Sequence, residues 1–204
     1  MDITKTFPKK TLAVFDLDGT ITSGDTMIEF IVFAKGKTAL YFSYLGLSFT
    51  LFFYKLGLLD NASAKKKLLK WHFKGMAEPE LNRLGMEFCE KILPSMVRAR
   101  ALERISWHKK KGHRIAIVSS SLEIWMKPWC IANQLDCIAT VPQYENGIFL
   151  GAFNSPNCYG PEKVNRIKEK VPADSYEFVY AYGDTTGDKE MMAFADMWYF
   201  KPFR

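Results

Sequence analysis

The stretch Thr11-Leu-Ala-Val-Phe-Asp-Leu-Asp-Gly-Thr-Ile-Thr22 decides the fold. Its first five residues are apolar, aromatic or β-branched, which predicts a buried strand. That strand ends on two carboxylates, Asp16 and Asp18, where a Gly-Thr turn begins. Ligands of open α/β sheets bind outside the carboxyl ends of the strands, so acids placed there are positioned for chemistry. The alternative is a solvated turn, because Asp and Gly are common in turns.

The rest of the chain continues the alternation of strands and helices that is typical of an α/β fold. Apolar runs predict strands at 114–118, 137–141, 177–182 and 197–200, and a hairpin over 143–153 that turns at Asn146-Gly147. Helices are predicted at 25–35, over much of 61–104, up to about 133, from Pro161 to about 170, and up to about 195.

Length and composition indicate an ordinary globular chain. Its 204 residues suffice for one domain, or for one domain with a modest insertion. The four cysteines form no Cys-x-x-Cys pair, and residues 1–10 lack the apolar segment of a secretion signal. We therefore expect a reduced, cytoplasmic protein. The three histidines lack metal-ligand spacing, which argues against a zinc enzyme.

The net charge of +6 is concentrated in one segment. Residues 35–74 contain eight lysines and a single acidic residue, Asp60, so this segment carries +7 and the rest of the chain −1. Such a field attracts anionic ligands, whether phosphates, nucleic acid or acidic lipid. We do not expect nucleic acid, because the segment has no Arg and no recognised binding module.

Residues 39–59 form a long apolar segment with seven aromatic side chains and one charge, Lys55. The segment is nearly as long as the ~20 residues that a transmembrane helix needs. A single span is excluded if residues before and after it build one catalytic core, because it would separate them across the membrane. Two interpretations remain: a helix buried inside a helical domain, which we favour, or a hairpin or amphipathic surface that docks on a bilayer.

Four segments resemble, in order, the four motifs of the haloacid dehalogenase superfamily: Asp16-Leu-Asp-Gly-Thr20, Ser119 after a strand, Lys163 on a later helix, and Gly183-Asp-Thr-Thr-Gly-Asp188. The long insertion after the first motif resembles the cap of the phosphoserine phosphatase-like branch. Within that branch the chain is similar to bacterial phosphatidylglycerophosphatase C-type proteins. The resemblance implies an α/β fold with a Rossmann-like parallel-sheet core at 1–23 and 100–204, and an inserted all-helical cap at 24–99.

The resemblance also implies a role for each motif residue. Asp16 matches the nucleophile that forms an aspartyl phosphate, and Asp18 matches the general acid and base. Phosphate binding is implied for Thr20, Ser119 and Lys163, and Mg²⁺ binding for Asp16, the Asp18 carbonyl, Asp184 and Asp188. Asp18 favours phosphate-ester hydrolysis over dehalogenation, because family dehalogenases lack this residue.

Each role has a structural alternative. Lys163 would be a solvated helix residue, and Asp188 would be the N-cap of the helix that follows it. Ser120 and Glu123 have the spacing of a capping box, so we expect Ser120 to cap the helix and Ser119 to bind phosphate.

The substrate is left open by the sequence. Asp25 lies where phosphoserine phosphatases usually carry a Glu that contacts the substrate amine. The aromatic, lysine-rich insertion suits a phospholipid monoester such as phosphatidylglycerophosphate, with the enzyme peripheral at the inner face of the cell membrane. The alternatives are a small soluble phosphate such as phosphoserine and, more remotely, a non-catalytic phosphate-binding module.

Overall fold

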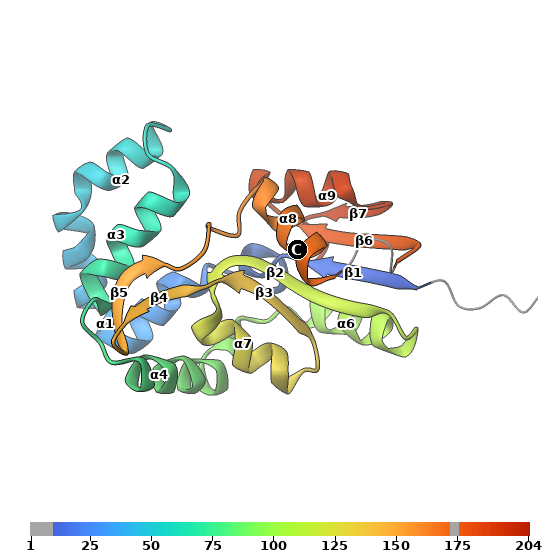
Figure 1. The fold of residues 1–204 in the computed structure, drawn as a ribbon, viewed down its shortest axis with the longest axis horizontal. Helices are drawn as coiled ribbons and strands as arrows, with labels where there is room; N and C mark the ends of the chain where they lie inside the picture. Colours follow the sequence, from blue (N-terminus) through green and yellow to red (C-terminus); the bar gives the residue numbers. More distant parts are fainter. Residues whose placement is uncertain (1–9, 172–175) are drawn as a thin grey trace, which may run out of the picture.

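A computed structural model describes residues 10–171 and 176–204. Its centre is a parallel five-stranded sheet in the order β3-β2-β1-β6-β7, with a separate hairpin, β4–β5 (Figure 1). The strands are β1 (Thr11–Phe15), β2 (Arg114–Leu122), β3 (Asp136–Thr140), β4 (Pro142–Glu145), β5 (Ile148–Phe153), β6 (Phe178–Gly183) and β7 (Met197–Phe200). The predicted α/β fold with a parallel sheet is confirmed, whereas residues 1–9, where no secretion signal is expected, lie outside the described residues.

The helices follow the predicted pattern, except that α1 runs beyond the predicted 25–35 and α2 follows it. They are α1 (Thr26–Gly46), α2 (Ser48–Lys55), α3 (Asn61–Phe73), α4 (Glu78–Lys91), α5 (Leu93–Met96), α6 (Ala99–Lys110), α7 (Glu123–Ala132), α8 (Pro161–Lys170) and α9 (Lys189–Phe194). Two short helical turns, η1 (Leu17–Ile21) and η3 (Thr186–Asp188), lie at strand ends. Figure 1 shows α8 and α9 on one side of the sheet and α6 and α7 on the other.

The strand β1 is central because its side chains are buried on both faces. Leu12 and Val14 pack toward Ile167 of α8 and Met191 of α9 in one core cluster. Ala13 and Phe15 belong to the other cluster, which includes residues of α6 and α7 and continues into the insertion. A strand covered on both faces needs a continuous apolar run, which explains why the sequence shows no alternation here.

The register of the sheet brings the ends of three strands together. Phe15, the last residue of β1, lies opposite Ile117 of β2 and Tyr182 of β6. Since all three strands run in the same direction, the residues that follow these positions gather at one edge of the sheet. That edge is where the sequence places Asp16, Ser119 and Asp184.

The hairpin β4–β5 turns at Asn146-Gly147, as predicted, with positive φ at both residues. It pairs with the connection between α3 and α4, where the backbone N–H of Gly75 donates to the carbonyl of Phe149 (2.9 Å). A β-bridge joins Ala77 to Ile148. The hairpin therefore ties the segment after β3 to the helices inserted after β1.

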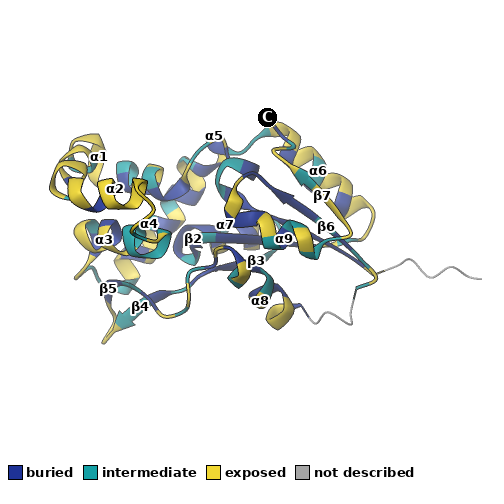
Figure 2. Ribbon diagram, turned by 90° about the horizontal axis from the view of Figure 1, so that it is seen from above, coloured by how far each residue is buried: buried dark blue, intermediate teal, exposed yellow. Residues whose placement is uncertain are grey.

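The favoured interpretation of residues 39–59, a buried helix, is wrong. The segment is the second half of α1 and all of α2, and it exposes Tyr41, Phe42, Leu45, Phe49, Phe52, Phe53, Leu56 and Leu58. Figure 2 shows α2 largely in the colour of exposed residues at one end of the molecule. Gly36, with a positive φ of 84°, bends α1, and α2 packs on α3. None of the helices in the described part of the chain is both long and apolar enough to cross a membrane.

A buried histidine predicts how stability depends on pH. His108 of α6 is fully buried, with its Nε2 2.9 Å from the hydroxyl of Tyr182 and its Nδ1 2.7 Å from Nδ1 of His113. Burial, followed by the charges of His113 and Arg104, lowers the pKa of His108 to about 3. Because an unfolded histidine has a pKa near ~6.5, the neutral form is favoured by folding. The resulting stability is present above pH ~6.5 and is lost as the pH falls toward 3.

We therefore expect His108→Gln to flatten the pH dependence of unfolding. Between pH 7 and pH 5 the wild type should lose up to about 2 kcal/mol more unfolding free energy than the variant, at ~1.4 kcal/mol per pH unit below ~6.5. Urea titrations at both pH values measure this difference. Equal losses in the two proteins would show that His108 does not titrate on unfolding.

Candidate active site

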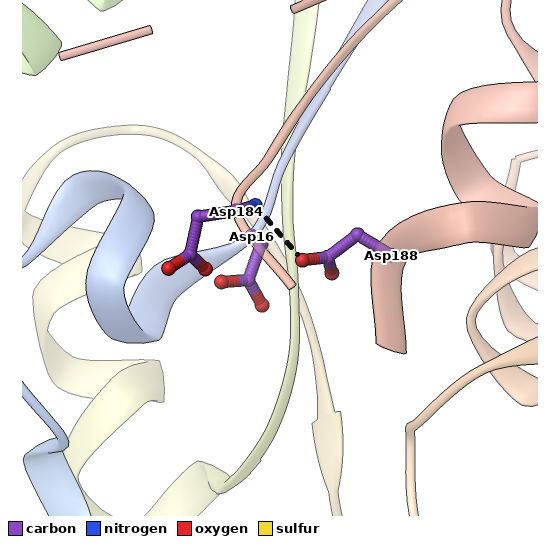
Figure 3. A group of neighbouring side chains, drawn as sticks. All are labelled: Asp16, Asp184 and Asp188. Atoms are coloured by element: carbon purple, nitrogen blue, oxygen red, sulfur yellow. Dashed lines mark hydrogen bonds between the residues drawn. The ribbon is translucent and has the colours of Figure 1, made fainter. Parts of the chain in front are cut away.

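Three buried carboxylates converge at the edge of the sheet (Figure 3). Asp16 directly follows β1, and Asp184 and Asp188 follow β6. One oxygen from each of the three lies within 4.8 Å of the others. The backbone N–H groups of Asp184 and Thr185 donate to Oδ2 of Asp188, both at 3.0 Å, which fixes that carboxylate. Asp188 thus belongs to a capping box with Thr185 and to the carboxylate cluster.

Lys163 neutralises part of this cluster. It lies in the first turn of α8, which Pro161 begins, and its side chain is 2% exposed. The ammonium donates to Oδ1 of Asp16 (2.5 Å), to Oδ1 of Asp188 (2.6 Å) and to the carbonyl of Val118 (2.9 Å). The solvated-helix alternative is therefore excluded for Lys163. Although burial opposes ionisation, the charge and hydrogen bonds of Lys163 lower the pKa of Asp188.

The three carboxylates outnumber the two basic side chains that contact them, Lys163 and Arg204, so the site suits a bound cation. Burial raises the pKa of Asp16 to about 7; Lys163 opposes this shift, and Asp188 and Asp18 reinforce it. Burial and the charge of Asp188 also raise the pKa of Asp184. Asp184 accepts from Thr20 Oγ1 (3.2 Å) and Arg204 Nη2 (2.5 Å). Clustered carboxylate oxygens are the donors that Mg²⁺ prefers, so the residues present fit such an ion.

Asp18 is held separately from the cluster. Its Oδ1 accepts from the backbone N–H of Thr26 (2.7 Å), and its Oδ2 accepts from the hydroxyl of Ser121 (2.5 Å). The hydroxyl of Ser119 lies 3.4 Å from the same Oδ2. These hydrogen bonds orient Asp18 independently of Asp16, although the two aspartates are separated by one residue. Roles were predicted for Ser119 and Ser120, and none was predicted for Ser121.

The three serines are placed differently from the prediction. The strand β2 runs on through them to Leu122, which is the N-cap residue of α7 and makes no side-chain capping bond. The predicted capping role of Ser120 is therefore wrong, because the helix starts too late for it. Ser120 instead lines the cavity of the site and accepts a hydrogen bond from Lys65 Nζ (2.6 Å). Ser119 is buried beside Asp18, and its phosphate role remains a prediction.

A cavity of about 350 Å³ opens over the carboxylates. Besides Asp16, Asp18 and Lys163, it is lined by Asp25, which also caps α1 by accepting from the N–H groups of Met27 and Ile28. Lys65 of α3 reaches the same cavity from the insertion. The sequence presented Lys65 as one of three consecutive lysines, and no sequence signal separated it from Lys66 and Lys67.

The lysine run is not a uniform solvated face. Lys66 lies over the ring of Phe153 (5.2 Å to the centroid), and Lys67 donates to the hydroxyl of Thr50 (3.2 Å). Replacing all three lysines at once would therefore alter the cavity, a packing contact and a contact between α3 and α2. Substitutions that test binding of this region to a membrane surface therefore have to be made at other residues.

Gly19 shows how closely the turn approaches the cluster. Its φ is +81°, and a Cβ added there would lie 2.5 Å from Oδ2 of Asp184. We expect Gly19→Ala to displace Asp184 and to destabilise the fold by about 1–3 kcal/mol. Gly24→Ala is the matched control, because nothing lies within 4 Å of its added Cβ and its φ is not positive. Urea unfolding of both variants measures the difference, and equal stability would contradict the expected clash.

Comparisons with known proteins agree with this geometry. The model of haloacid dehalogenase-like hydrolases matches residues 13–193. Protein CicA of Caulobacter vibrioides is 29% identical over 201 residues, covering 95% of this chain and 86% of that protein. The probable phosphatase Rv3661 of Mycobacterium tuberculosis is 29% identical over 199 residues, covering 90% of this chain and 66% of that protein. A substrate-bound phosphoserine phosphatase structure shares the fold, with a TM-score of 0.67 and 18% identity over 94% of this chain and 86% of that chain. The chain therefore belongs to the haloacid dehalogenase-like hydrolase family.

Proposed function

We propose that this chain is a Mg²⁺-dependent phosphate monoester hydrolase that works through an aspartyl phosphate on Asp16. The observation that carries the proposal is that Asp16 and Asp18, one residue apart, are held by different partners. Asp16 is buried against the ammonium of Lys163, whereas Asp18 is held by Ser121 and Thr26 on the other side of the turn. One carboxylate is placed to attack, and its neighbour is placed to move a proton.

In the first step a carboxylate oxygen of Asp16 attacks phosphorus, and the bond from phosphorus to the ester oxygen breaks. Asp18 gives its proton to the departing alkoxide oxygen. In the second step Asp18 takes a proton from water, and the water oxygen attacks the phosphorus of the aspartyl phosphate. The bond from phosphorus to Asp16 breaks, and inorganic phosphate leaves. Lys163 balances the negative charge on the phosphoryl oxygens in both steps.

The cofactor that suits this site is Mg²⁺. We assign its protein ligands to Asp16, Asp184 and the Asp18 carbonyl, with Asp188 as a further ligand or as the group that orients them. When bound, the ion supplies Lewis-acid stabilisation of the phosphoryl group.

We propose a phospholipid monoester such as phosphatidylglycerophosphate as the substrate. The exposed aromatic and aliphatic side chains of residues 41–58, here called the α1–α2 surface, form a patch that is unusual on a soluble monomer. Exposed Lys37 precedes it and exposed Lys55 lies within it, as expected of a surface that docks on anionic lipid. The patch adjoins the cavity, because Nδ2 of Asn61, which lines the cavity, donates to the hydroxyl of the exposed Tyr54 (3.3 Å).

The arrangement suits a headgroup that enters the cavity while its acyl chains stay in the membrane. We assign residues 24–99 to a cap over the core, with the cavity between the two. Lys65, on the cap side, provides a second cation for an anionic group next to the scissile phosphate. A phospholipid monoester with a phosphodiester in its headgroup carries such a group.

A small phosphorylated amino acid is the second candidate, and one observation favours it. Asp25 and Lys65 line the same cavity and carry opposite charges, which would suit the amine and carboxylate of phosphoserine. Side-by-side turnover of phosphatidylglycerophosphate, phosphatidate and phosphoserine in Mg²⁺ decides between the candidates. We expect the highest kcat/KM for phosphatidylglycerophosphate, and a preference for phosphoserine would overturn the lipid assignment. Turnover that persists after chelation of the metal would contradict the Mg²⁺ requirement.

Membrane docking predicts a second result. Replacing Phe49 (79% exposed) and Phe52 (57% exposed) with Gln should weaken binding to phosphatidylglycerol-containing vesicles by about tenfold or more, because both rings would leave the bilayer interface. Trp198→Gln on β7 is the control, since it removes an aromatic about as exposed as Phe52 (55%) far along the chain from this surface. Vesicle co-sedimentation measures binding. If the double variant binds as the wild type does, the α1–α2 surface is not the docking surface.

A further inference from the structure

A second cavity, of about 510 Å³, lies apart from the proposed active site. It is a cleft open to solvent and bounded by α4, α7 and β4, and it shares no lining residue with the cavity over the carboxylates. Met86, Pro128 and Ile131 give it apolar walls. Its volume falls within the range of about 300–1,000 Å³ that is typical of small-molecule sites.

The cavity is lined by an unpartnered hydroxyl and two unpartnered carboxylates. The hydroxyl of Tyr144 is buried and, among the described residues, has no hydrogen-bond partner. The carboxylates of Glu78 and Glu123 also line the cavity, and no ion pair or side-chain hydrogen bond engages either within the described part of the chain. Burial, together with the charges of Glu78 and Glu123, raises the pKa of Tyr144 to about 12, so its hydroxyl keeps its proton at neutral pH. An unpartnered buried hydroxyl is destabilising, which makes a ligand contact favourable there.

The chemistry of these groups selects the ligand. Two carboxylates accept hydrogen bonds only, and a phenol oxygen can accept one more, so the matching group is a cationic donor with several N–H bonds. An ammonium meets this requirement, and an apolar body would fill the rest of the cavity. Lys127 on the rim is exposed, so its own ammonium can turn to solvent. We propose that the cavity between α4, α7 and β4 binds a small primary amine with an apolar body.

At this location such a ligand would contact residues next to those of the proposed active site. Gly85 of α4 packs directly against the backbone of Ile124 of α7, so the cavity lies where these two helices meet. Glu123 is two residues after Ser121, whose hydroxyl holds Asp18. An amine on Glu123 would therefore bind beside the segment that positions the proton-transfer residue, without entering the cavity over Asp16.

Titration of the full-length protein with phenethylammonium, followed by calorimetry and by backbone amide NMR, tests the proposal. We expect saturable binding with a Kd of about 1 mM or tighter, as for efficient ligands of this size, with shifts in residues of α4, α7 and β4. Hexanol, which is neutral, and hexanoate, which is an anion, should both bind at least about tenfold more weakly, because neither brings a cation to the carboxylates.

Variants distinguish amine binding in this cavity from amine binding to the acidic groups of the proposed active site. The double change Glu78→Gln and Glu123→Gln should reduce affinity about tenfold or more, and the conservative Tyr144→Phe should reduce it severalfold. Asp25→Asn, in the other cavity, should leave the affinity unchanged. Loss of binding in Asp25→Asn, equal binding of hexanol, or no saturation up to about 10 mM would overturn the proposal. Because the readout is binding, these outcomes do not depend on whether the chain hydrolyses a phosphate ester.

Discussion

Replacing Asp16 with Asn is expected to reduce turnover of an aryl phosphate by about 10⁴-fold or more, as is found for the loss of other catalytic nucleophiles. The amide keeps the shape of the side chain but lacks the charge and nucleophilicity of the carboxylate. Asp16 is 6% exposed and its Oδ1 accepts from the ammonium of Lys163, and the change leaves no carboxylate at this position. The loss should fall on kcat, because the covalent step itself is removed.

The same change should leave the fold in place. Lys163 keeps its contacts to Asp188 and to the carbonyl of Val118, so its ammonium remains paired in Asp16→Asn. Circular dichroism and thermal unfolding should therefore match the wild type closely, while steady-state assays record the loss. Residual turnover within tenfold of the wild type would eliminate Asp16 as the nucleophile.

Replacing Lys163 with Met should affect both stability and activity. The change leaves the buried carboxylates of Asp16 and Asp188 without their shared cation. Breaking a buried ion pair from one side typically costs about 3–5 kcal/mol, so we expect a loss of that size in the unfolding free energy. Turnover should fall by about 10²–10³-fold in the protein that remains folded, because charge on the phosphoryl oxygens is no longer balanced.

Lys168→Met is the matched control for this prediction. Lys168 lies on the same helix, is exposed, and lies over the ring of Phe194 (5.6 Å to the centroid) away from the cluster. Its replacement should change the unfolding free energy and the turnover little. Urea unfolding and nitrophenyl phosphate assays compare the two variants, and similar effects in both would show that the position of Lys163 is unimportant.

The sheet could be predicted from sequence because its signals are local. A buried parallel strand needs an unbroken apolar run, and β1 has the predicted bounds. The edge strand β7 also has its predicted bounds, although most of its residues are exposed. The turn at Asn146-Gly147 and the helix start at Pro161 follow from backbone preferences of those residues. Asp16 and Asp184 could likewise be placed together, because parallel strands end at the same edge, whereas the resemblance to the family motifs predicted that Lys163 and Asp188 join them.

The remaining features depend on contacts between distant segments. An apolar helix has the same sequence whether a domain or a membrane covers it, so the exposure of the α1–α2 surface could not be predicted. Lys65 and Ser120 are 55 residues apart, and their contact depends on how α3 lies over the core. The hydroxyl of Ser121 reaches Asp18 because β2 continues past Val118, which polar serines gave no reason to expect.

The most direct test of the account is capture of the phosphoryl group on Asp16. Asp18→Asn lacks the base for the second step, while a good leaving group such as nitrophenolate needs little help from an acid in the first. Asp18→Asn mixed with Mg²⁺ and nitrophenyl phosphate, quenched in acid and digested, should therefore yield a peptide containing residue 16 that carries one phosphoryl group. Hydroxylamine should release that group, and the added change Asp16→Asn should prevent it from forming. A phosphoryl group on another residue, or stoichiometric turnover with none on Asp16, would contradict the account.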